Sequence, residues 1–127
     1  MSNLSDDTLR RILQQIEGQA VSATRSLSVV RAQIQSRERE RKILTLTQRE
    51  LADVPGECKM YKGVGKMFVL QSRKDVDGTL SAQEKTVSED LTNLAKKSKY
   101  LQKQADEANA QLNDIFRSQL RAQEQQS

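Results

Sequence analysis

Two long heptad repeats constrain the fold of this chain more than any other feature of its sequence. Apolar residues recur in alternating steps of four and three from Leu9 to Leu51, and again from Leu80 to Ala122. Ten of the thirteen stepped positions are apolar in each run. Such a repeat of about 3.5 residues keeps one stripe of a helix against a partner helix, whereas a helix in a globular core is shorter and has a wider apolar stripe. The pattern therefore predicts two long coiled-coil helices.

Helix-breaking residues gather between the two runs. The only proline, Pro55, lies there, together with four of the five glycines. We therefore expect one helix over 5–52, a short centre, and a second helix over 80–122. The polar residues 123–127 are expected to form a disordered tail.

Serine residues mark the expected start of each helix. Ser5 precedes two aspartates, which suit the first turn of a helix because of the helix dipole. Ser81 and Glu84 have the spacing of a capping box, in which each side chain bonds the other residue's backbone N–H. We therefore expect Ser5 and Ser81 to cap the two helices.

The two helices are expected to fold back on one another as an antiparallel pair, because a short centre joins runs of similar length. One register sets Leu27 opposite Ala108, so that large residues face small ones. A slip of one heptad sets Ala20 opposite Ala108 instead. We favour the first register because alternating residue sizes pack evenly.

The centre has the features of a single β-hairpin over 57–71. Gly65 and Lys66 fit a two-residue turn with glycine at the position that needs a positive φ. This turn pairs Tyr61 with Leu70 and places Phe68 opposite Gly63, where an aromatic ring can cover the glycine. Both faces of the hairpin are largely apolar.

A hairpin of this size is marginally stable in water, and its open edges favour pairing with other strands. We therefore predict an assembly surface, formed by Met60, Tyr61, Val64, Met67, Phe68, Val69 and Leu70. The alternative is that the hairpin packs on its own helix ends near Ile43 and Leu46. Cys58 is expected to be a packed strand residue.

The composition disfavours enzymes and several kinds of binding protein. The chain has no histidine, one cysteine and 3% aromatic residues among 127, so we expect no catalytic site, metal site or cofactor. The net charge is +4, but Arg37–Lys42 alternates in sign, unlike the concentrated basic face of a nucleic-acid-binding protein. No apolar run is long enough for a membrane span, and we expect a cytoplasmic protein.

The order helix, hairpin, helix, with Tyr61 followed by Val64-Gly65-Lys66-Met67-Phe68 and an apolar strand, resembles the prefoldin family. The single hairpin resembles that of the β-type class. The resemblance implies one prefoldin-like domain over 1–127, mostly α-helical, whose hairpin contributes to an oligomeric β-barrel. It also implies a heterohexamer with two α-type and three further β-type subunits. Such a complex would capture unfolded polypeptides, of the actin and tubulin class, and deliver them without ATP to the cytosolic chaperonin.

Apolar residues that the seam does not use are expected near the two chain ends. We predict that clients bind there, at the tip of the coiled coil, to Leu4, Ile12, Phe116 and Leu120 and to the neighbouring seam residue Leu13. The alternative is that Phe116 and Leu120 continue the seam after a stutter and cover the end of the helix pair. A coiled-coil tether or scaffold without chaperone activity would share both helices but would not need the apolar hairpin.

Overall fold

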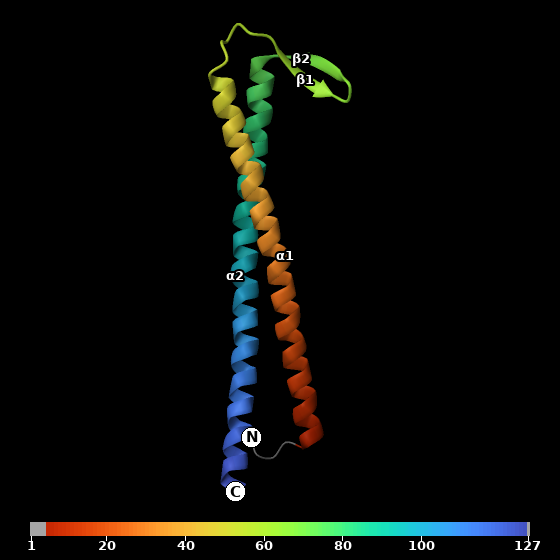
Figure 1. The fold of residues 1–127 in the computed structure, drawn as a ribbon, viewed down its shortest axis with the longest axis vertical. Coiled ribbons are helices and arrows are strands. Elements are labelled where there is room, and N and C mark those ends of the chain that lie inside the picture. The colour runs from red at the N-terminus through yellow and green to blue at the C-terminus, as the bar shows by residue number, and fades with distance from the viewer. Residues whose placement is uncertain (1–4, 127) are drawn as a thin grey trace. The chain divides into compact units, whose positions relative to one another are not determined.

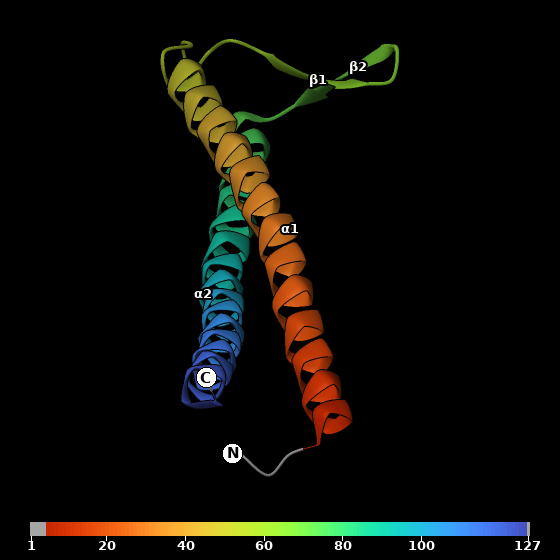
Figure 2. The same cartoon turned by 60° about the horizontal axis from the view of Figure 1, so that its bottom comes forward.

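The computed structural model describes residues 5–126 of the chain, which fold as helix, hairpin and helix (Figure 1). The elements are α1 (Asp6–Ala52), β1 (Met60–Val64), β2 (Met67–Gln71) and α2 (Arg73–Gln126). Figure 2 shows the same order from a second direction. The predicted fold class, two long helices around one antiparallel hairpin, is confirmed. Among residues 5–126 there is no helix with enough length and apolar character to span a membrane.

The first helix begins where the sequence predicts. The Thr8 N–H donates to Ser5 Oγ at 3.2 Å, and the Leu9 N–H donates to the Ser5 carbonyl oxygen at 2.9 Å. These bonds satisfy N–H groups that have no partner within the helix. Asp6 and Asp7 occupy the first turn, where the helix dipole favours negative charge.

The second helix begins seven residues earlier than predicted, and Ser81 does not cap it. Ser72 is the cap, because its Oγ accepts the Asp75 N–H and its carbonyl accepts the Val76 N–H, each at 3.1 Å. Gly78 lies inside the helix rather than before it, a placement that costs only about 1 kcal/mol relative to alanine. A single glycine was therefore too weak a signal to delay the helix.

The expected disordered tail is also corrected by the structure. Helix α2 continues through Gln126, and Ser127 lies outside the described residues. Residues 121–126 contain only arginine, alanine, glutamine and glutamate, all of which favour helices. Because no glycine or proline stops it, the helix extends past the end of the heptad run.

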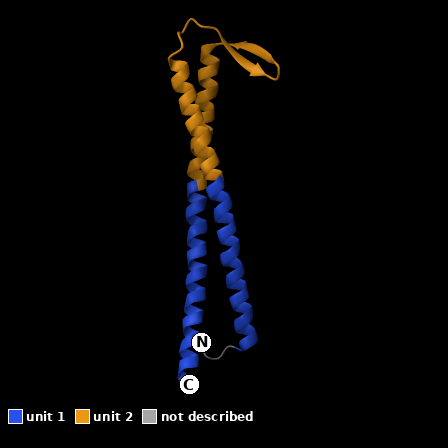
Figure 3. Ribbon diagram, in the orientation of Figure 1, with its two compact units in different colours: residues 1–32, 95–127 blue, residues 33–94 orange. Residues whose placement is uncertain are grey.

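The chain forms two compact units (Figure 3). Unit 1 comprises residues 1–32 and 95–127, and unit 2 comprises residues 33–94. In each unit a stretch of α1 lies beside an antiparallel stretch of α2. The expectation of one domain over the whole chain stays a prediction.

The core consists of a single layer of side chains on the predicted heptad positions. Val30 is the most deeply buried of them, with 2% of its surface exposed. All nine buried apolar residues of the described chain lie on the two heptad runs: Ala20, Ala23, Leu27, Val30, Leu44, Val87, Leu101, Ala105 and Ala108. Within residues 5–125 no polar or charged side chain is buried. The predicted seam is therefore confirmed.

Unit 2 has the second of the two registers, so the one that we favoured is wrong there. Arg37 Nε lies 3.7 Å from Asp90 Oδ2. In the second register Asp90 faces Glu38, the neighbour of Arg37, whereas in the first it would face Thr45. Helical side chains lean toward their own N-terminus, so in the first register these two side chains would lean apart across about 12 Å. The first register was favoured on residue size alone, and that criterion took no account of the charge of Arg37 on the seam.

The register can be tested by cysteine cross-linking of unit 2 in a Cys58→Ser background. We expect Leu44→Cys with Glu84→Cys to form a disulfide readily, because these residues face one another in the second register. Leu44→Cys with Leu91→Cys, the matched pair of the first register, is expected to stay reduced, since a disulfide needs Cα atoms within about 7 Å. Faster oxidation of the second pair, measured by electrophoretic mobility, would contradict the assignment.

Candidate functional site

The hairpin has the predicted register and turn. Tyr61 pairs with Leu70 and Gly63 pairs with Phe68. Gly65 has a φ of +59°, the left-handed conformation that glycine adopts without steric cost. A Cβ atom on Gly63 would lie 3.8 Å from Cε1 of Phe68, so the ring lies beside the glycine as expected.

The hairpin exposes apolar side chains on both of its faces. Phe68 has the largest exposed fraction, 78%, and Met60 alone is half-buried. The other large apolar residues of the predicted assembly surface are exposed: Tyr61, Val64, Met67, Val69 and Leu70. Contiguous apolar surface that is exposed to water usually marks a site of interaction with another molecule.

The hairpin does not pack on its own helix ends. It extends to the side of the helices of unit 2 in both views (Figures 1 and 2). Ile43 and Leu46, the expected receiving residues, are also exposed. The alternative in which the hairpin folds back on α1 is therefore wrong for this structure.

Each strand of the hairpin also has an open edge. Within residues 5–126 the sheet consists of β1 and β2 alone, so each strand has only one neighbour. Unpaired backbone N–H and C=O groups on such edges can extend the sheet by pairing with strands of other chains. Open edges and apolar faces together suit addition of the hairpin to a larger sheet.

The segment between α1 and β1 differs from the prediction. Cys58 is exposed and precedes the strand, and its N–H donates to the Pro55 carbonyl at 3.1 Å in a turn. It is therefore not a packed strand residue. Proline and glycine at 55 and 56 favour this turn and delay the strand until Met60.

Sequence reasoning missed one residue at the base of the hairpin. Arg73, the first residue of α2, donates to the carbonyl oxygen of Leu51 in the last turn of α1 and to that of Val54 just after this helix. The sequence signal for this role was the position of Arg73 at the start of a helix, where the helix dipole disfavours a positive charge. The signal is visible only once the helix is known to begin at Arg73.

Four of the predicted client-binding residues lie near the terminal ends of the helices in unit 1. The first turns of α1 and the last turns of α2 lie at the same end of this unit (Figure 3). Ile12 and Leu13 are half-buried, whereas Phe116 is 53% and Leu120 is 59% exposed. These exposures do not support the alternative in which Phe116 and Leu120 cover the helix ends. Leu4 lies outside the described residues.

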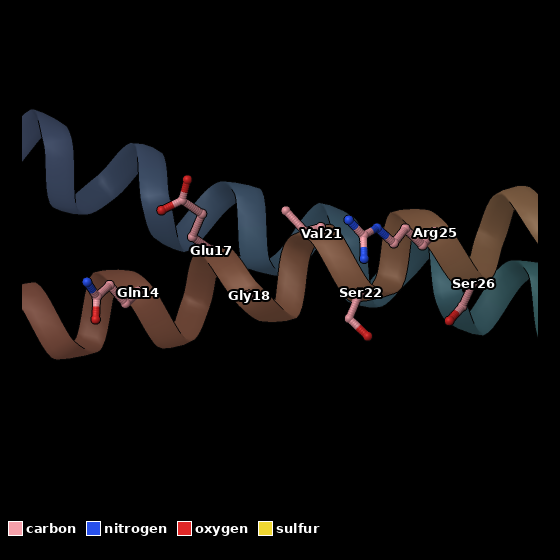
Figure 4. A pocket seen from close by; sticks show the side chains of 7 residues that line it. All are labelled: Gln14, Glu17, Gly18, Val21, Ser22, Arg25 and Ser26. Atoms are coloured by element: carbon pink, nitrogen blue, oxygen red, sulfur yellow. The ribbon is translucent and has the colours of Figure 1, made fainter.

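A shallow hollow on α1 in unit 1 offers no chemistry for a ligand (Figure 4). Gly18 is one of its lining residues, and no heavy atom lies within 4 Å of the position that a Cβ would take there. Residues of α1 alone line it, and none of them has a buried polar group. Across the described residues, histidine, cysteine and carboxylate side chains form no cluster of three that could hold a metal.

Comparison with known proteins identifies the family. Residues 14–119 match the profile of the prefoldin subunit family. The chain belongs to the prefoldin family. The expected role, that of a prefoldin co-chaperone subunit, is thus supported by sequence comparison as well as by fold.

Similar curated proteins point to one subunit type of prefoldin. The chain is 35% identical over 94 residues to the probable prefoldin subunit 1 of Dictyostelium discoideum, covering 74% of this chain and 82% of that protein. It is 27% identical to prefoldin subunit 1 of Tetraodon nigroviridis, with 91% and 95% covered. The human prefoldin subunit 1 is likewise 27% identical, with 87% and 91% covered.

A solved structure confirms the β-type fold. The prefoldin beta subunit from Thermococcus strain KS-1 superimposes with a TM-score of 0.77, covering 92% of this chain and 98% of that one. The sequences are 24% identical, so this likeness concerns the fold alone. It agrees with the single hairpin that joins the two helices of this prefoldin chain.

Proposed function

We propose that this prefoldin subunit joins two α-type and three further β-type subunits through its hairpin. The exposure of both apolar faces of the hairpin is the observation that carries this proposal. In a closed barrel of strands, the open edges of β1 and β2 would gain partners and one apolar face would be removed from water. Membership of the prefoldin family supports assembly with other prefoldin subunits.

We further propose that the terminal helix ends hold unfolded polypeptides, of the actin and tubulin class, for delivery to the chaperonin. An unfolded chain presents apolar groups without a fixed shape, so shallow contacts with Ile12, Leu13, Phe116 and Leu120 suit it better than a deep pocket. Repetition of such contacts over several subunits increases the total affinity through avidity. Leu4 is proposed to contribute to the same surface.

The proposed activity is binding and release in the cytoplasm, without ATP and without a catalytic step. No residue on either proposed surface needs a cofactor for this role. The apolar surfaces of the hairpin and of the helix ends supply the binding free energy by leaving water.

The assembly proposal is tested by mixing the chain with an α-type prefoldin subunit and measuring the mass of the product under native conditions. We expect a complex heavier than either chain alone, whereas this chain of 14.4 kDa by itself should self-associate heterogeneously. The opposite result is a stable helical dimer of this chain that does not bind the α-type subunit. That result would contradict the proposal and favour a coiled-coil tether.

A further inference from the structure

We propose that Arg73 is a positioning residue for subunit assembly, because it locks the base of the hairpin to the end of α1. This inference rests on the proposed assembly through the hairpin. It adds a residue outside the hairpin that determines how the hairpin is presented to other subunits.

Arg73 joins two parts of unit 2 that are distant in sequence. Its Nη2 donates to the Leu51 carbonyl oxygen at 2.6 Å, and its Nη1 donates to the Val54 carbonyl oxygen at 2.8 Å. Because two nitrogens of one planar group bond two different carbonyls, the orientation of the guanidinium is fixed as well as its position. The side chain is half-buried, which protects these bonds from competition by water.

The electrostatics show which helix benefits from this arginine. A positive charge at the first residue of α2 is unfavourable for that helix, because its N-terminal end is already positive. The same charge is favourable at the C-terminal end of α1, where carbonyl groups lack partners within the helix. In the described part of the chain the guanidinium pairs with no carboxylate. Arg73 therefore stabilises the contact between the two helix ends rather than α2 itself.

The connections of the hairpin explain why this contact positions it. A single residue, Ser72, separates β2 from α2, so the start of α2 determines where β2 ends. The other strand is joined to α1 by residues 53–59, a segment of turns long enough to move. By holding Val54 and the start of α2 together, Arg73 ties this segment at one end. An element held in its bound orientation loses less conformational entropy on association.

The test compares Arg73→Met with Lys74→Met. Methionine retains an apolar stem but removes all five donors, and Lys74 is a neighbouring exposed cation that makes no hydrogen bond or ion pair among the described residues. A nitroxide label on the native Cys58 reports motion of the 53–59 segment. Circular dichroism measures helicity, and titration with an α-type prefoldin subunit measures assembly.

Arg73→Met is expected to keep the helicity of the native chain, increase the mobility of the label on Cys58, and weaken assembly about tenfold. Lys74→Met should behave like the native chain in all three measurements. Arg73→Lys, which can donate to one carbonyl at a time, should fall between them. Native label mobility in Arg73→Met, or an equal effect of Lys74→Met, would overturn the proposal.

Loss of helicity in Arg73→Met would also overturn it, because Arg73 would then be required for folding rather than for positioning. The label experiment uses the chain without a partner and diluted until it is monomeric, so its result is independent of the proposed assembly. If the native chain itself fails to assemble, the proposed function fails, whereas the mobility comparison still decides whether Arg73 fixes the segment.

Discussion

Phe68→Ser is expected to weaken the entry of the chain into a prefoldin complex strongly while leaving both helices intact. The ring is 78% exposed in the isolated chain and lies beside Gly63 of its own hairpin, so its removal should cost the monomer little. In an assembly that buries this face, the same ring would contribute about 1.5–3 kcal/mol. Loss of that contribution corresponds to roughly a tenfold to hundredfold weaker association. Native mass measurement with an α-type subunit detects it.

The control for this experiment is Phe116→Ser. The chain contains two phenylalanines, and Phe116 is also exposed but lies on α2 in unit 1. The Phe116→Ser variant should therefore assemble as the native chain does. Equal loss of assembly in both variants would indicate that exposed apolar surface in general drives association, which would contradict a specific role for the hairpin.

Ile12→Ser combined with Phe116→Ser is expected to reduce client capture several-fold in the assembled complex. Both residues belong to the proposed client surface, and the loss of apolar contact is multiplied wherever a client touches several subunits. Suppression of aggregation by the complex, measured by light scattering with a chemically unfolded client, should fall accordingly. Helicity and assembly should remain those of the native chain.

Matched replacements elsewhere on α1 control for lost apolar surface. Val29 and Ile43 are each more than half exposed and lie outside the proposed surfaces. Val29→Ser with Ile43→Ser should leave client capture unchanged. If this control pair reduced capture as much as the replacements of Ile12 and Phe116, the assignment of clients to the helix ends would be wrong.

Periodicity made the helices and their buried seam predictable. A heptad run predicts both that a helix forms and which stripe of it is buried. The buried positions from Ala20 to Ala108 could therefore be predicted from the sequence. The hairpin register was equally accessible, because Gly65 fixes the turn and the turn fixes every pair. In both cases the information is local in the sequence.

The errors arose where local signals competed or where contacts are distant in sequence. Ser72 and Ser81 are both plausible caps, and the choice depended on whether Gly78 interrupts the helix. The register in unit 2 is visible in a pair between Arg37 and Asp90, whose contact across the two helices no heptad pattern encodes. Arg73 is distant in sequence from both carbonyls that it bonds, so only the folded chain reveals its role.

Hydrogen exchange of the backbone N–H groups of β1 and β2 tests the central claim most directly. The outward N–H groups on both edges of the hairpin should exchange rapidly in the isolated chain, diluted until it is monomeric, since no other strand then covers them. On assembly with an α-type prefoldin subunit, we expect these groups to become protected while exchange in the helices changes little. If the edges of Met60–Gln71 stay unprotected in a complex that has formed, the hairpin does not join the subunits and the account is wrong.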